Sequence, residues 1–242
     1  MIRAVWVTVT LTLATFLFGS IAMVASLLRV RGGIYYWCTR NWARTALRVS
    51  GVRVHVHHPE RFLRDEPQVV VSNHLSFYDI FALAAVLPLP FHFVGKKDLE
   101  KIPFFGLAWR AAGHISLDRS NRRRAMESLR KAGRRIRSER SAVIIFAEGT
   151  RSRTGRIQPF KRGAFILARE AEVPIVPVAI EGSFEIMQPD RWAIRPSDIH
   201  VRVLPPYFPG EWGDASPEAL AEEVHDRIRG RLKLPLEGAR SG

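Results

Sequence analysis

The sequence contains a single cysteine, Cys38, among its 242 residues. One thiol cannot form an intrachain disulfide, and a zinc site built from cysteines needs several of them. The Gly-x-Ser-x-Gly pattern of a hydrolase nucleophile elbow is also missing from the chain. A disulfide scaffold, a cysteine-based metal site and a serine hydrolase of that type are therefore excluded.

Acidic residues are scarce relative to basic ones. The chain has 23 Asp and Glu against 37 Lys and Arg, which gives a formal net charge of +14. Such an excess indicates an anionic partner, which could be nucleic acid, an acidic membrane surface or a phosphorylated substrate. Apolar residues make up 47% of the chain, enough for a packed core, so a disordered protein is excluded.

Charge is completely absent between Arg3 and Arg29. A helix over residues 4–28 would be roughly 38 Å long, longer than the roughly 30 Å hydrocarbon core of a bilayer. The sequence thus predicts a membrane helix that spans the bilayer or enters it as half of a hairpin. A cleaved signal peptide is the alternative, but basic residues, not a small-residue cleavage site, follow the apolar run.

The next segment combines Tyr and Trp with arginines that recur every four residues, Arg40, Arg44 and Arg48. On a helix these arginines form one stripe, which is typical of an interfacial helix bound to anionic lipids; a solvated surface helix is the alternative. Positive charge after the apolar run, from Arg29 to Arg48, exceeds that before it. This predicts attachment to the inner (cytoplasmic) membrane with the body of the protein in the cytoplasm.

Residues 1–50 are accordingly expected to anchor the chain, and residues 51–242 to form one domain. Short apolar runs alternate there with helical patterns, which predicts an α/β fold: a largely parallel sheet flanked by helices. The predicted strands are 52–56, 68–72, 91–94, 114–117, 142–147, 175–180 and 199–204, and the predicted helices are 80–86, 104–112, 122–138, 164–170 and 217–232.

A histidine and an aspartate follow the predicted strand 68–72. On a regular helix His74 and Asp79 would point about 140° apart, so they can meet only across a turn that enters the next helix. The carboxyl end of a strand is where open α/β sheets place their sites. A carboxylate on one ring nitrogen leaves the other free to take a proton from a hydroxyl. The pair is a candidate base with its orienting group, with coincidental spacing as the alternative.

Two further polar segments end at the same predicted sheet edge. In one, Gly149 makes a turn that brings backbone amides forward, and Arg151 supplies a forked donor suited to a phosphate. In the other, Lys96 and Arg119 each follow a short apolar strand. Cations converging on one rim predict an anionic substrate, whereas exposed charges on polar loops are the alternative.

Four blocks, in this order and spacing, resemble the glycerolipid acyltransferase family, of which the bacterial 1-acylglycerol-3-phosphate acyltransferases are the commonest members. The blocks are Asn73-His74-x4-Asp79, the basic stretch from Gly95 to Arg119, Phe146 to Ser152 and Val173 to Val178. The resemblance covers about residues 69–183.

The resemblance implies acyl transfer from acyl-CoA or acyl carrier protein to the free sn-2 hydroxyl of 1-acylglycerol 3-phosphate, giving phosphatidic acid. Lyso-ornithine lipid or another lysophospholipid is the alternative acceptor. No metal and no cofactor is implied, because the acyl donor is a substrate; the expected partners are this donor, the acceptor and anionic membrane lipids.

The resemblance also assigns residue roles. His74 would be the general base and Asp79 its orienter. The residues expected to hold the substrate phosphate are Lys96, Arg119 and Arg151, and those expected to shape the acceptor site are Glu148 and Gly149. Apart from the resemblance, most aromatic residues are expected in the core or at interfaces, and Trp109 with Phe104 and Phe105 are expected to line the route for acyl chains.

Two other readings remain. Residues 119–140 contain ten Arg or Lys and could bind DNA phosphates, but they carry no known binding motif and the apolar helix would hold them at a membrane, so no nucleic acid is expected. His55 and His57 alternate on a predicted strand, which could suggest a metal site. No carboxylate or further histidine lies at a useful spacing, so a solvated strand face is favoured.

Overall fold

The structure, a computed structural model, describes residues 2–30, 32–118, 120–189 and 193–232. Within these residues seven strands form one sheet in the order β1-β7-β6-β2-β5-β3-β4. Their bounds are β1 Arg53–His57, β2 Gln68–Ser72, β3 Phe91–Lys96, β4 Ile115–Leu117, β5 Ala142–Phe146, β6 Ile175–Glu181 and β7 Asp198–Val203. All seven predicted strands are confirmed, with ends that differ by at most two residues.

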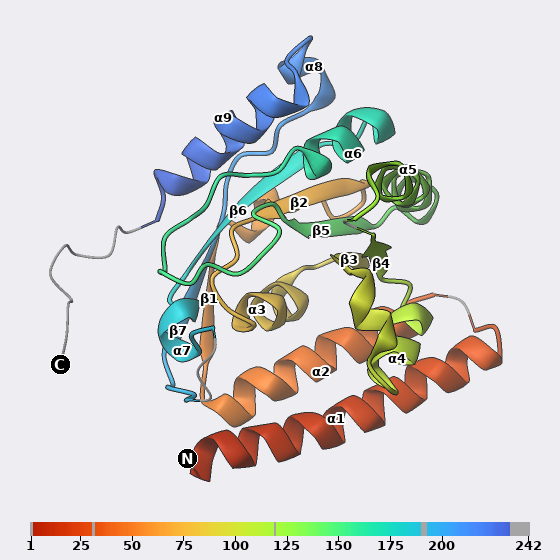
Figure 1. The fold of residues 1–242 in the computed structure, drawn as a ribbon, viewed down its shortest axis with the longest axis vertical. Helices are drawn as coiled ribbons and strands as arrows, with labels where there is room; N and C mark the ends of the chain where they lie inside the picture. The colour runs from red at the N-terminus through yellow and green to blue at the C-terminus, as the bar shows by residue number, and fades with distance from the viewer. Residues whose placement is uncertain (1, 31, 119, 190–192, 233–242) are drawn as a thin grey trace, which may run out of the picture.

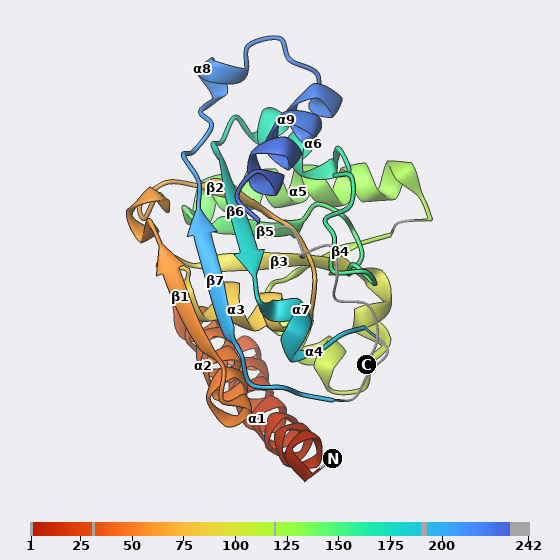
Figure 2. The ribbon, with the colours of Figure 1, turned by 90° about the vertical axis from the view of Figure 1, so that its left-hand side faces the viewer.

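The sheet is mostly parallel. Only β6 and β7 pair antiparallel, whereas β1 pairs parallel with β7 and the other neighbours pair parallel throughout. Figure 2 shows the strands turning progressively from β1 to β3, the usual twist of such a sheet. Because β2, β5 and β3 run in the same direction, their carboxyl ends lie along one edge.

Helices cover both faces of the sheet (Figure 1). The α-helices are α1 Ile2–Leu27, α2 Ile34–Ser50, α3 Tyr78–Val86, α4 Phe105–Ala111, α5 Arg122–Glu139, α6 Gly163–Ala171, α7 Ser183–Ile186, α8 Pro209–Trp212 and α9 Pro217–Arg229, and the 3-10 helices are η1 Pro59–Arg61 and η2 Lys97–Lys101.

The last helix is shorter than predicted. The Ser216 side chain caps its start by accepting the Ala219 N–H at 3.1 Å, and Pro217 occupies the first turn. The helix ends at Arg229 instead of 232, because the N–H groups after Gly230 bond to carbonyls three residues back: Arg231 donates to Ile228 at 3.0 Å and Leu232 to Arg229 at 3.2 Å. The low helix propensity of glycine at position 230 is consistent with an end at this point.

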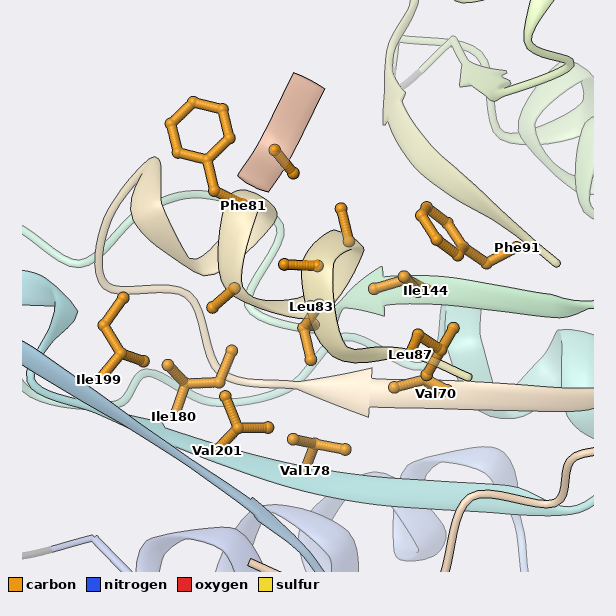
Figure 3. Close-up of a cluster of buried hydrophobic side chains, with 14 of the residues drawn as sticks. Val70, Phe81, Leu83, Leu87, Phe91, Ile144, Val178, Ile180, Ile199 and Val201 are labelled. Atoms are coloured by element: carbon orange, nitrogen blue, oxygen red, sulfur yellow. The ribbon is translucent and has the colours of Figure 1, made fainter. Parts of the chain in front are cut away.

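Each face of the sheet has its own core. Val70, Ile144 and Val178 point toward α3, where Leu83 meets them, whereas Phe81 lies on the far side of α3 (Figure 3) and packs on Trp42 of α2. The alternate residues Val69, Val71 and their neighbours pack on the opposite face against α5, α6 and α9. Strands buried on both faces read as continuous apolar runs, which is why β2 and β5 were predictable from the sequence.

Helix α1 is the one described helix long and apolar enough to cross a membrane, with a mean hydropathy of 2.0 over Arg3–Leu27. It runs antiparallel to α2 and also packs on α4 (Figure 1). Val7, Ala14, Ala22 and Ala25 are buried in these contacts. The other side of α1 stays bare, and its exposed large side chains include Val5, Trp6, Val9, Leu13, Phe16, Leu17, Val24 and Leu27.

The basic segments lie on different sides of the molecule. Helix α5 packs on the face of the sheet opposite to α1, α2 and α3 (Figure 1). Within the predicted arginine stripe of α2, Arg40 donates to the Ala85 carbonyl of α3 at 3.2 Å. This arginine is therefore engaged inside the protein, and Arg48 is the exposed member of the stripe.

Candidate active site

The turn that carries His74 begins with Asn73, whose side chain bonds to the backbone of β6 in the way that a neighbouring strand would. The Asn73 amide donates to the Ile180 carbonyl at 2.9 Å, and its oxygen accepts the Ile180 N–H at 2.8 Å. Asn73 is fully buried, so this pair fastens the end of β2 to β6. The reactive turn therefore leaves the sheet from a fixed point.

His74 and Asp79 meet across this turn, as the geometric prediction required. His74 Nδ1 lies 2.9 Å from Asp79 Oδ2, which also accepts the backbone N–H groups of Leu75 at 2.6 Å and Ser76 at 2.8 Å. Asp79 stands in the first turn of α3 and is fully buried. A carboxylate only accepts, so Nδ1 carries the ring proton and Nε2 is left as the acceptor.

The imidazole ring is held on a second side by Phe146, the last residue of β5. The two rings stack with centroids 4.0 Å apart and planes 15° apart. The His74 side chain is 13% exposed, so it remains open to a substrate on one side. The ring is therefore fixed in place by a carboxylate at its edge and an aromatic ring on its face.

Glu148 supports the same turn from behind. Its Oε1 accepts the His74 N–H at 2.7 Å and its Oε2 accepts the Gln158 N–H at 3.0 Å. The His74 carbonyl in turn accepts the Ser152 N–H at 2.9 Å. Burial raises the pKa of Glu148 to about 7, an effect that the two N–H groups oppose and the charge of Asp79 reinforces.

The segment after Glu148 brings a cation to the site. Gly149 has a φ of +75°, and a Cβ there would lie 2.9 Å from Lys161 Nζ, so glycine suits this position on both counts. Arg151 stacks its guanidinium over the Phe77 ring at 3.9 Å. Such stacking orients the planar guanidinium group, whose forked N–H donors suit an anion such as a phosphate.

Lys96, at the end of β3, supplies a second cation at this edge. Its Nζ lies 2.5 Å from Asp98 Oδ2, and the side chain is 62% exposed. The third predicted cation, Arg119, lies outside the described residues. The structure therefore brings Lys96, Gly149 and Arg151 to the same cleft as His74, while Asp79 and Glu148 stand behind it.

The cleft has a volume of about 730 Å³ and runs from His74 between the sheet and helices α1, α2 and α4. Phe105 and Trp109 line it as predicted, whereas Phe104 is not among its lining residues and packs on Phe16 of α1 with ring centroids 4.6 Å apart. The lining residues that sequence reasoning missed include Thr15, Gly19 and Ala22 of α1, Cys38 and Trp42 of α2, and His114.

The histidines of β1 have neighbours that the sequence spacing concealed. His55 Nε2 lies 2.9 Å from Asp198 Oδ2, and His57 Nε2 lies 3.1 Å from His200 Nδ1. These partners lie at no useful spacing along the sequence and come close only because β7, far along the chain, pairs with β1. Even so, no group of three or more His, Cys, Asp or Glu suited to a metal occurs among the described residues.

Comparison with known proteins gives a consistent picture. The sequence profile of the family described as Acyltransferase matches residues 53–181. The 1-acyl-sn-glycerol-3-phosphate acyltransferase of Haemophilus influenzae is 30% identical over 191 residues, which cover 79% of each chain. The human 1-acyl-sn-glycerol-3-phosphate acyltransferase alpha is 36% identical over 194 residues, which cover 79% of this chain and 68% of the human protein.

Other relatives are longer than this chain. The 1-acyl-sn-glycerol-3-phosphate acyltransferase of Cocos nucifera is 32% identical over 157 residues, and the matched region spans 51% of its length. Among solved structures, the 1-acyl-sn-glycerophosphate (LPA) acyltransferase PlsC of Thermotoga maritima superposes with a TM-score of 0.81 at 25% identity. That match covers 95% of this chain and 92% of the PlsC chain, so it includes the helices that precede the sheet.

Proposed function

Because the chain belongs to the Acyltransferase family, we propose that it transfers a fatty acyl group to the free sn-2 hydroxyl of 1-acylglycerol 3-phosphate, giving phosphatidic acid. The acyl donor is a thioester, either acyl-CoA or acyl carrier protein. The observation that carries the proposal is the His74–Asp79 pair at one end of an apolar cleft, with Lys96 and Arg151 beside it.

In the proposed reaction His74 Nε2 takes the proton of the acceptor hydroxyl as its oxygen attacks the thioester carbonyl carbon. Asp79 keeps the proton on Nδ1 and stabilises the imidazolium that forms. The tetrahedral intermediate then collapses, the carbon–sulfur bond breaks, and the leaving thiolate takes the proton back from His74. The hydroxyl and the thioester supply all the reacting atoms, so this sequence uses no cofactor and no metal.

The acceptor phosphate is proposed to bind Lys96 and Arg151, together with Arg119, which lies outside the described residues. Charge-assisted hydrogen bonds of this kind hold a dianionic head group in a defined orientation. Glu148 and Gly149 shape the acceptor site from behind: the carboxylate fixes the His74 turn, and the glycine leaves room for Lys161.

Membrane attachment through α1 and α2 is part of the same proposal. Helix α1 contacts α2 and α4 from Val7 to Ala25, so it cannot leave the domain to cross a bilayer without losing these contacts. A helix lying in the interface, with its bare apolar face toward lipid, keeps them. The arginines after α1 favour an inner (cytoplasmic) membrane with the catalytic domain on its cytoplasmic side.

A defined set of substrates tests the proposed function. The purified enzyme is assayed with one acyl-CoA and one acyl carrier protein thioester against 1-acylglycerol 3-phosphate, lyso-ornithine lipid and a zwitterionic lysophospholipid. We expect the phosphate monoester to give the highest kcat/KM, and His74→Ala to abolish turnover while vesicle binding is retained.

Turnover retained by His74→Ala would remove the histidine from its role as base. A preference for lyso-ornithine lipid would leave the reaction class intact and change the acceptor. Salt-sensitive binding to DNA without vesicle binding or acyl transfer would instead favour a nucleic-acid-binding protein.

A further inference from the structure

His114 is a polar residue in the cleft that the proposed reaction does not use. It stands directly before β4, and its ring packs on Trp109 with centroids 4.5 Å apart and edge-on to Phe93 at 5.6 Å. Both of these aromatic residues line the cleft together with His114. An imidazole has therefore been placed among apolar groups of the cleft wall.

A series of ring contacts connects His114 with the reactive end. His74 stacks on Phe146 at 4.0 Å, Phe146 faces Phe93 at 6.4 Å, and Phe93 meets His114. All four residues line the same cleft. A fatty acyl chain whose carbonyl carbon is beside His74 can run along this wall, so the methylene groups farther along it reach His114.

The proton on the His114 ring can be assigned. Nδ1 accepts the backbone N–H of Phe93 at 3.2 Å. Burial lowers the pKa of His114 to about 3, and the charges of His92 and Arg135 act in the same direction. The ring is neutral at ordinary pH, so its single proton is on Nε2. Nε2 has no hydrogen-bond partner in the part of the chain that the structure describes.

Neighbouring donors in the cleft wall are already paired. Trp42 Nε1 donates to Thr15 Oγ1 at 3.0 Å, and Trp109 Nε1 donates to Ser116 Oγ at 3.1 Å. The hydroxyls of Thr15 and Thr39 donate to carbonyls of their own helices. The Cys38 thiol also lines the cleft, but a thiol is only a weak donor. Among the described side chains of this wall, the Nε2–H of His114 is thus the strong donor that has no hydrogen-bond acceptor.

We propose that the Nε2–H of His114 forms a subsite for an oxygen substituent, such as a hydroxyl group, on the fatty acyl chain held in the cleft. The inference rests on the proposed function, since it requires an acyl chain in this cleft. A plain methylene chain displaces water and leaves the N–H unpaired, which costs about 1–3 kcal/mol. A chain with an oxygen at the matching carbon satisfies the N–H, and a site of this kind discriminates between the two chains.

The test compares plain and hydroxylated chains of one length. In one arm, acyl-CoA donors with the hydroxyl at successive carbons are assayed with a plain acceptor; in the other, the sn-1 chain of the acceptor carries the hydroxyl and the donor is plain. We expect one hydroxyl position, in one of the arms, to raise wild-type kcat/KM about tenfold over the plain chain. The arm in which this occurs identifies the chain that occupies the cleft.

Two variants check that the preference comes from His114. His114→Asn keeps an oxygen near the Nδ1 position for the Phe93 N–H but removes the Nε2–H, so the tenfold preference should be lost. His92→Asn is the matched control, since His92 is also buried but pairs with Glu139 and is not among the residues that line the cleft. His92→Asn should keep the wild-type preference for the hydroxylated chain over the plain chain.

The subsite is contradicted if the wild type favours the plain chain at every hydroxyl position in both arms. It is equally contradicted if His114→Asn retains the preference. These outcomes are separate from the proposed function, which is measured by wild-type turnover of the plain substrates alone. Because each ratio is taken within one enzyme, a partial loss of folded protein in a variant cancels.

Discussion

Glu148 shows how the burial of one carboxyl group links the site to pH. Its pKa is raised to about 7 from the ordinary glutamate value of 4.5, mainly by burial. Between these values the folded state holds a proton that the unfolded state has lost, so stability falls as pH rises through that window. At 1.36 kcal/mol per pKa unit, the loss is about 3 kcal/mol.

We therefore expect Glu148→Gln to flatten the fall in unfolding free energy of the wild type between pH 5 and pH 8. The variant is less stable overall, since its amide NH2 faces a backbone N–H, so the slope and not the absolute value is the readout. Glu127→Gln on the surface of α5, where the side chain is 58% exposed, is the control and should keep the wild-type slope. Parallel slopes for wild type and Glu148→Gln, measured by denaturant unfolding, would contradict the pKa assignment.

Arg151 carries a prediction for substrate binding. Its removal takes away a charge-assisted contact worth about 1.5–3 kcal/mol, so Arg151→Ala should raise the acceptor KM by roughly 10- to 100-fold with little change in kcat. Arg156→Ala, an exposed arginine on the same segment, is the control. Steady-state kinetics with varied acceptor measures both; an unchanged KM for Arg151→Ala would place the head group elsewhere.

At the scale of single residues, the sequence predicted those site residues that lie close to one another along the chain. His74 and Asp79 were predictable because both flank one turn after one strand, and Gly149 and Arg151 because they follow another. The cleft could not be predicted from the sequence. Gly19 and Cys38, which line it, come from α1 and α2, and no local sequence pattern specifies which elements these helices pack on. His114 could have been suspected only as a lone histidine among apolar residues.

Among the elements, α4 owes its position to a glycine. A Cβ on Gly106 would lie 2.1 Å from the Glu100 carbonyl oxygen, so η2 and α4 can approach this closely only without a side chain there. Overpacking of this kind costs about 1–3 kcal/mol. Since α4 forms one wall of the cleft, a displacement of this helix also changes the space for the substrate.

Gly106→Ala should accordingly lower the Tm by several degrees and reduce kcat/KM. Gly210→Ala in α8 is a matched control, because a Cβ there has nothing within 4 Å. Thermal unfolding of the two variants in the same detergent compares them directly. Equal Tm values for Gly106→Ala and Gly210→Ala would mean that α4 can shift without loss of stability.

Strands and helices were predictable as elements, but their arrangement was not. The apolar runs of β2, β5 and β6 are continuous because both faces are buried, and this marks them in the sequence. Which strands become neighbours depends on long-range pairing. For that reason the contact between His55 on β1 and Asp198 on β7 was invisible before the sheet order was known.

At the scale of the whole molecule, the apolar and basic surfaces are separated. The bare face of α1 is on the side of the α3 core, and α5 is on the opposite side of the sheet (Figure 1). A flat bilayer that contacts α1 therefore does not contact α5 as well. The basic charge of α5 is then left facing water.

Vesicle flotation tests this orientation. Leu13→Asp with Leu17→Asp places charges on the bare face of α1, where these side chains are 64% and 58% exposed. Each buried leucine contributes about 1.5–3 kcal/mol to partitioning, so binding should fall at least tenfold. Lys131→Glu with Arg134→Glu on α5 should leave it nearly unchanged; a comparable loss would show that α5 also touches the membrane.

The two hydrogen bonds between Asn73 and Ile180 also set the order in which parts of the site can form during synthesis. The reactive turn is fixed by a residue that the ribosome adds 107 positions later. The apolar helix α1 emerges long before that, so the nascent chain can reach a membrane while its histidine is still unsupported. On the proposed function, the site would therefore be complete only after β6 has joined the sheet.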